Sequence, residues 1–187
     1  MDLINELTRV LGANYTGCSS IHRKAEMFVF DPSGENPVII HDGSNPELLK
    51  QLRVANQNGQ YYFIAVDFCL TIDNTHFLKP NGNMADKCDC IIYNSNVLYF
   101  IEIKDRKKKA VPVAINEALK QIEKTITVFQ NIGIDFIGTR QKVVAFTARR
   151  QFNNEPFSFS ASTGSKKAYF KQTYNIELED SFEIILN

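Results

Sequence analysis

The sequence has no tryptophan, and it holds only four cysteines, nine glycines and six prolines among 187 residues. So little glycine and proline excludes collagen-like and low-complexity chains. The longest apolar runs, Tyr61–Val66 and Val97–Ile101, are far shorter than the ~20 residues of a membrane-spanning helix. The first residues also lack the basic and apolar segments of a secretory signal. We therefore expect a cytoplasmic protein whose cysteines are reduced thiols.

The length and composition suit one globular domain spanning residues 1–187. The chain is 44% hydrophobic and 22% charged, close to the average of soluble domains. Apolar residues at helical spacing predict helices over 2–11 and 112–133. Asn45-Pro46-Glu47, a cap with proline at the first helical position, predicts another helix over 45–56. Strand patterns cover 25–30, 38–41, 61–72, 89–93, 97–104 and 141–147, with one or two more within 174–186. The segment 152–165 has no regular pattern. The combination of predicted helices and strands indicates an α/β fold.

The formal net charge is zero, but the charges are unevenly distributed. Residues 25–102 contain ten acidic and four basic side chains, whereas residues 104–150 contain eleven basic and four acidic ones. An acidic segment followed by a basic one is compatible with a cation site beside a nucleic-acid surface. The alternative is an ordinary solvated surface of helices and loops.

The segment 89–104 predicts a β-hairpin with a two-residue turn at Ser95-Asn96. In that register Asn94 faces Val97, and Asp89 faces Glu102 at the far end of the hairpin. Both faces are otherwise apolar, so we expect the hairpin to be covered on both sides.

Two carboxylates whose Cβ atoms are about 5 Å apart in such a setting destabilise the sheet unless something compensates them. A Mg²⁺ ion, which prefers carboxylate and carbonyl oxygens, would do so. Lys104 lies two residues beyond Glu102, on the same predicted face. The alternative is an edge-strand ion pair between Glu102 and Lys104, with Asp89 solvated.

Asp89, followed after twelve residues by Glu102-Ile103-Lys104, resembles the Asp…Glu-x-Lys signature of the PD-(D/E)XK nuclease superfamily. This superfamily includes restriction endonucleases and Holliday junction resolvases. The predicted hairpin, helix and further strand over about residues 85–148 are similar to the core of that family. The resemblance implies a restriction-endonuclease-like core, in which a mixed β-sheet is flanked by helices.

The resemblance also implies roles for individual residues. Asp89, Glu102 and the backbone carbonyl of Ile103 would hold Mg²⁺ or Mn²⁺, and Lys104 would position or activate the attacking water. Gln121, on the following helix, would be an auxiliary catalytic residue. Family members often add an early acidic residue to the metal site, for which the candidates here are, in order, Glu6, Glu26 and Glu47.

The stretch Arg106-Lys107-Lys108-Lys109 follows the motif directly, and such residues bind nucleic-acid phosphates irrespective of sequence. A solvated loop is the alternative. The expected partner is nucleic acid, DNA ahead of RNA, with no membrane involved. The resemblance further implies a homodimer.

Three neighbours of Asp89 are expected to be structural. Strand alternation places Cys88 and Cys90 together on the sheet face opposite Asp89, as buried core residues rather than zinc ligands. Lys87 is expected to form a loop pair with Asp86.

The sequence therefore predicts a metal-dependent nuclease that hydrolyses nucleic-acid phosphodiester bonds. The alternative is a non-catalytic relative that serves as a binding, immunity-like or accessory protein. A third reading is a metal-dependent hydrolase of other phosphoesters.

Overall fold

The fold was described from a computed structural model of the chain. The structure describes residues 5–9, 17–31, 39–43, 51–57, 59–67, 87–104, 111–134, 142–149, 161–181 and 183–187. No helix within these ranges is both long enough and apolar enough to cross a membrane.

A six-stranded mixed sheet forms the centre of the molecule, with the spatial order β1-β5-β6-β7-β8-β9. The strands β1, β5, β6 and β7 are antiparallel, whereas β7, β8 and β9 are parallel. Parallel neighbours require crossover connections, and the helices α2 and α3 supply them. The bounds of these elements are Ser19–His22 (β1), Tyr61–Ala65 (β5), Cys90–Tyr93 (β6), Val97–Lys104 (β7), Val111–Asn131 (α2), Lys142–Arg149 (β8), Ala161–Tyr174 (α3) and Glu177–Ser181 (β9).

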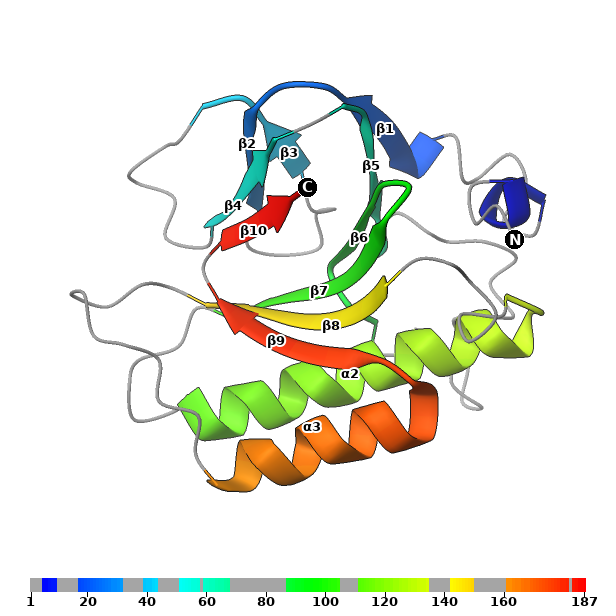
Figure 1. The fold of residues 1–187 in the computed structure, drawn as a ribbon, viewed down its shortest axis with the longest axis vertical. Helices are drawn as coiled ribbons and strands as arrows, with labels where there is room; N and C mark the ends of the chain where they lie inside the picture. Colours follow the sequence, from blue (N-terminus) through cyan, green and yellow to red (C-terminus); the bar gives the residue numbers. More distant parts are fainter. Residues whose placement is uncertain are drawn as a thin grey trace.

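A second sheet has four strands in the order β10-β4-β2-β3. Its strands are Glu26–Phe30 (β2), Ile39–His41 (β3), Gln51–Asn56 (β4) and Glu183–Leu186 (β10). Figure 1 shows α2 and α3 on one side of the six-stranded sheet and this smaller sheet on the other. The protein is thus an α/β fold of mixed sheets flanked by helices, as the sequence predicts.

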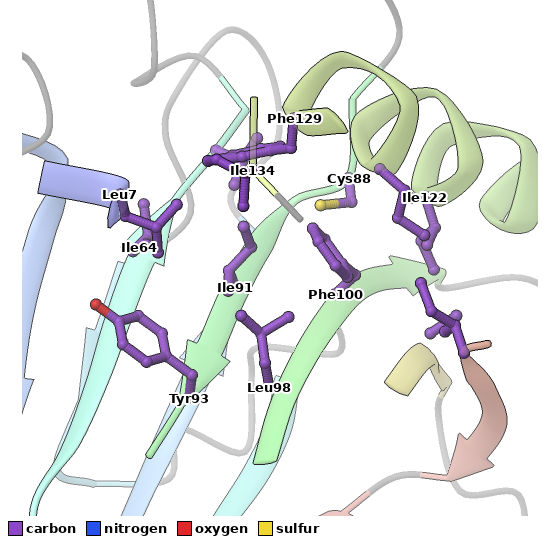
Figure 2. Packing of buried hydrophobic residues seen from close by; sticks show 14 of the residues in the cluster. Leu7, Ile64, Cys88, Ile91, Tyr93, Leu98, Phe100, Ile122, Phe129 and Ile134 are labelled. Atoms are coloured by element: carbon purple, nitrogen blue, oxygen red, sulfur yellow. The ribbon is translucent and has the colours of Figure 1, made fainter. Parts of the chain in front are cut away.

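Each face of the central sheet has its own apolar core. On the helical face, Phe100 and Phe129 meet edge to face with their ring centroids 6.1 Å apart, and Ile122 packs beside them (Figure 2). On the other face, Ile92 and Tyr99 belong to a cluster shared with the four-stranded sheet. The expectation that both faces of the hairpin are covered is confirmed.

The β6–β7 hairpin has the predicted register. Tyr93 pairs with Leu98, and the N–H of Asn94 donates to the carbonyl of Val97 at 2.9 Å. The side-chain oxygen of Asn94 also accepts the N–H groups of Asn96 and Val97 at 2.9 and 3.0 Å. An asparagine that binds the backbone two residues ahead is a common way to fix a tight turn.

Two predictions about secondary structure are wrong. Residues 51–56 form strand β4 rather than the end of a helix, because the buried residues alternate with more exposed neighbours, and Leu52 and Val54 pack in the core between the sheets. Residues 161–174 form helix α3, although the sequence suggested irregular structure up to residue 165. This helix is mostly polar and buries few side chains, so its apolar periodicity is weak.

Replacing Phe129 with alanine should lower the free energy of unfolding by about 3–5 kcal/mol, because it leaves a cavity in the helical-face core. Urea denaturation followed by circular dichroism measures this change. Asn116→Ala, at an exposed position of the same helix, is the control and should change stability by less than about 0.5 kcal/mol. Equal effects of the two variants would contradict this packing.

Candidate metal site at the end of the hairpin

The β6–β7 ladder is interrupted at Asp89. Cys90 is the register partner of Ile101, yet the N–H of Asp89 also donates to the carbonyl of Ile101 at 3.0 Å. Asp89 and Cys90, two consecutive residues, therefore both lie opposite the single residue Ile101 of β7, which is the geometry of a β-bulge. The predicted pairing of Asp89 with Glu102 is accordingly replaced by a local kink, because β6 begins only at Cys90.

The kink turns the Asp89 carboxylate towards the backbone of β7. Its Oδ2 accepts the N–H of Ile103 at 2.6 Å. The carbonyl of Asp89 accepts the N–H groups of Val66 and Asp67 at 2.9 and 3.2 Å, which ties the residue to the end of β5. Asp89 is thus held by main-chain groups on both sides, and the residue is only 6% exposed.

The same kink changes the bonding of Cys88. In an uninterrupted ladder, the N–H of Cys88 would donate to the carbonyl of Ile103. Here it donates instead to Oγ1 of the buried Thr125 on α2, at 2.8 Å, and Thr125 donates to the carbonyl of Gln121 at 2.9 Å. The carbonyl of Ile103 therefore does not accept the N–H of Cys88, as it would in a regular ladder.

Glu102 lies beside this kink, buried to 1% exposure. It follows Leu98 and Phe100 at alternate positions of β7, which places it on the helical face. Burial, with the charges of Glu102 and Asp89 as smaller causes, raises the pKa of the Cys88 thiol. Both carboxylates are thus close enough to Cys88 to act on it electrostatically.

The prediction that Cys88 and Cys90 share a sheet face is wrong. Cys88 packs in the helical-face core (Figure 2), whereas Cys90 packs between the two sheets. The bulge supplies the reason, because its extra residue breaks the alternation of side chains. Both are free thiols whose pKa is raised by burial, so they stay protonated at neutral pH.

Cys18, in contrast, is disulfide-bonded, so the expectation of uniformly reduced cysteines is wrong at that residue. Disulfides persist mainly in oxidising compartments. The predicted cytoplasmic location therefore stays a prediction, and this bond counts against it.

The remaining motif residues are placed to different extents. Lys104 ends β7 and is the register partner of Arg149, while its side chain lies outside the described part. Nε2 of Gln121 donates to the carbonyl of Lys87 at 3.3 Å, so Gln121 reaches the segment that carries Asp89. The basic stretch Arg106–Lys109 lies outside the described residues.

Of the early acidic candidates, Glu6 and Glu26 lie in the described part of the chain, and each pairs with an arginine. Glu6 accepts hydrogen bonds from Arg9, which lower the pKa of the Glu6 carboxyl. Glu26 pairs with Arg53 at 2.5 Å on the four-stranded sheet, and Glu47 lies outside the described residues. Within the ranges that the structure describes, no three His, Cys, Asp or Glu side chains gather as a metal centre.

Lys87 is a residue whose setting the sequence did not indicate. It is 2% exposed rather than part of a solvated loop, and its Nζ lies 4.0 Å from Oδ1 of Asp67. Burial lowers the pKa of Lys87, and the charge of Asp67 offsets part of that effect. In the sequence, the only sign that Lys87 is buried is its position directly before the apolar run that begins at Cys88.

Comparisons of the chain with protein-family models, curated proteins and solved structures found no match. The chemistry of the site therefore rests on the two buried carboxylates, the carbonyl of Ile103 and the bulge that arranges them.

Thr125→Val should lower the free energy of unfolding by about 1–3 kcal/mol, because the buried N–H of Cys88 loses its acceptor. Thr127→Val is a matched control on the same helix. Thr127 is exposed, and its hydroxyl donates to the carbonyl four residues earlier, as that of Thr125 does. The control should change stability by less than about 0.5 kcal/mol in urea denaturation. Equal losses would contradict the role given to Thr125.

Lys87→Met should raise the free energy of unfolding at neutral pH, because the folded protein no longer buries an ammonium group. In the wild-type protein, the free-energy cost of burying the Lys87 ammonium group is fully present below the lowered pKa of folded Lys87. It fades as the pH rises from that pKa towards 10.5, since only the unfolded chain still holds the proton. Urea denaturation at several pH values measures the difference. A stability gain of Lys87→Met that grows with pH would contradict the lowered pKa of Lys87.

Proposed function

We propose that the protein is a metal-dependent nuclease of the PD-(D/E)XK type that hydrolyses phosphodiester bonds, in DNA ahead of RNA. The observation that carries the proposal is the pair of buried carboxylates, Asp89 and Glu102, at the kinked end of a hairpin. Burying two carboxylates is costly unless a cation or hydrogen bonds compensate them.

The arrangement of the elements supports the proposal. Three antiparallel strands, β5, β6 and β7, are followed by α2 and by β8, which is parallel to β7. The resemblance implies the same order of hairpin, helix and strand in a restriction-endonuclease-like core. In such a core, Asp89 and Glu102 would be the active-site carboxylates.

The donor atoms suit a hard divalent cation. Mg²⁺ and Mn²⁺ bind carboxylate and carbonyl oxygens and keep several waters. Asp89, Glu102 and the carbonyl of Ile103 would hold such an ion, because the bulge diverts the N–H of Cys88 from that carbonyl. When bound, the ion would lower the pKa of a water and offset charge on the phosphate.

The protein's own residues would arrange the reaction. Asp89 is held in place by the N–H of Ile103. Lys104, at the end of β7, would orient the attacking water or accept its proton. Gln121 would act as a positioning residue, since its side chain bonds the backbone of the segment that carries Asp89. Substrate binding by Arg106–Lys109 and a homodimer complete the proposal.

A non-catalytic nucleic-acid-binding, immunity-like or accessory protein is the second candidate. The observation that favours it is that, among the described residues, no three His, Cys, Asp or Glu side chains are grouped so that they could hold a metal ion. Such a protein would keep the fold and the buried carboxylates without performing hydrolysis.

Purified protein should cleave DNA with Mg²⁺ or Mn²⁺ and not with EDTA. Supercoiled, linear, branched and single-stranded DNA, with RNA alongside, cover the substrate shapes. Asp89→Asn, Glu102→Gln and Lys104→Ala should each lower the rate at least about 100-fold, which corresponds to about 2.7 kcal/mol of transition-state stabilisation.

Glu177→Gln is the control, because Glu177 is an exposed carboxylate that pairs with Lys142 on the same sheet. It should cleave at the wild-type rate, and circular dichroism should show every variant folded. Cleavage that persists in Glu102→Gln would refute the assigned site. Nucleic-acid binding without cleavage under any of these conditions would favour the non-catalytic candidate.

A further inference from the structure

The outer layer of the molecule is formed by α2 and α3, which lie side by side (Figure 1). Glu123 on α2 joins them, since its Oε1 accepts the hydroxyl groups of Tyr169 at 2.6 Å and Tyr174 at 2.7 Å. Tyr169 also packs edge to face against Phe170, which is buried beneath it. The two helices therefore present one continuous surface of fixed shape.

This surface carries an excess of positive charge. Helix α3 has three lysines and no acidic residue, and α2 adds two lysines to its two glutamates. Glu123 keeps its negative charge while its Oε1 accepts the two tyrosine hydroxyls, so the five lysines exceed the two glutamates by three charges. We call the set of lysines the α2–α3 lysine surface; its members are Lys120, Lys124, Lys166, Lys167 and Lys171.

Two of these lysines are neighbours across the helix–helix seam. Lys166 is half-buried, and its burial, with the charge of Lys120 as a smaller cause, lowers the pKa of Lys166. Neither Lys120 nor Lys166 forms an ion pair with an acidic residue of the described chain. Two ammonium groups held near each other repel, and an anion bound between them would offset that repulsion.

An aromatic ring lies among the lysines. Tyr169 is 46% exposed, and it follows Lys166 and Lys167 on α3. Its ring is held by Phe170, Tyr174 and the bond to Glu123. Basic side chains around an exposed, fixed aromatic ring are typical of surfaces that bind single-stranded nucleic acid.

We propose that the α2–α3 lysine surface docks the phosphate backbone of a polynucleotide, and that Tyr169 stacks on an unpaired base. This inference rests on the proposed nuclease function in one respect, which is that the polyanion bound by the lysines is taken to be a nucleic acid. An anionic membrane is disfavoured, because a membrane-surface helix needs a broad apolar face. Helix α3 instead exposes mainly polar residues.

Fluorescence anisotropy with labelled single-stranded and duplex oligonucleotides tests the proposal in EDTA, where no metal-dependent cleavage occurs. Lys120→Gln/Lys166→Gln should weaken binding at least tenfold and reduce the slope of log K against log salt by about 2. The matched control is Arg23→Gln/Lys24→Gln, which removes the same charge from the exposed β1–β2 connection. It should bind within twofold of wild type.

Tyr169→Ala should weaken binding of the single strand about fivefold or more and leave the duplex unaffected, because only unpaired bases stack on it. Tyr169→Phe keeps the ring and should bind like wild type. A single-strand affinity that falls equally in the Ala and Phe variants would overturn the stacking role.

Equal losses in the two double variants would show a general charge effect and overturn the proposal. The absence of oligonucleotide binding by the wild-type protein would overturn it too, as would binding to anionic phosphatidylserine vesicles alone. Failure of the proposed nuclease function would instead appear as intact binding in EDTA with no cleavage in Mg²⁺ or Mn²⁺. The two failures are therefore distinguishable.

Discussion

The hydrogen bond from the N–H of Ile103 to the carboxylate of Asp89 replaces a main-chain bond at the point where the β6–β7 ladder is interrupted. A buried N–H must find an acceptor, and here a charged side chain supplies it. The exchange fixes Asp89 beside Glu102 and redirects the N–H of Cys88 to Thr125 on α2. One bulge thus connects the carboxylates, the strand that carries the Glu-x-Lys motif and the helix behind them.

The position of this bulge between two cores explains why the carboxylates are so well shielded. The helices cover one face of the central sheet and the four-stranded sheet covers the other. In such a setting a carboxylate is stabilised by main-chain donors or by a cation, since water is excluded. The proposed cation site and the local backbone geometry are therefore two consequences of the same burial. The lysines of α2 and α3 form a separate surface, which we propose binds a polyanion.

The sequence predicted the hairpin well because its signals are local. A two-residue turn at Ser95-Asn96 and alternating apolar residues determine the register. Helix α2 ends at Asn131, close to the predicted end at Gly133, whose φ of +92° suits glycine. The bulge could not be predicted, because it depends on the side-chain acceptors of Asp89 and Thr125. Helix α3 was missed because its residues are mostly polar, and β4 was misread because Pro46 resembles a helix start.

Titration calorimetry with Mn²⁺ tests the assignment of Asp89 and Glu102 as a cation site most directly, since it needs no substrate. Wild-type protein should bind the ion with a measurable heat, and Glu177→Gln should bind it equally well. Glu102→Gln, which keeps the shape of the side chain and removes its charge, should lose the binding. An unchanged binding isotherm in folded Glu102→Gln, or no binding by the wild-type protein, would contradict the assignment.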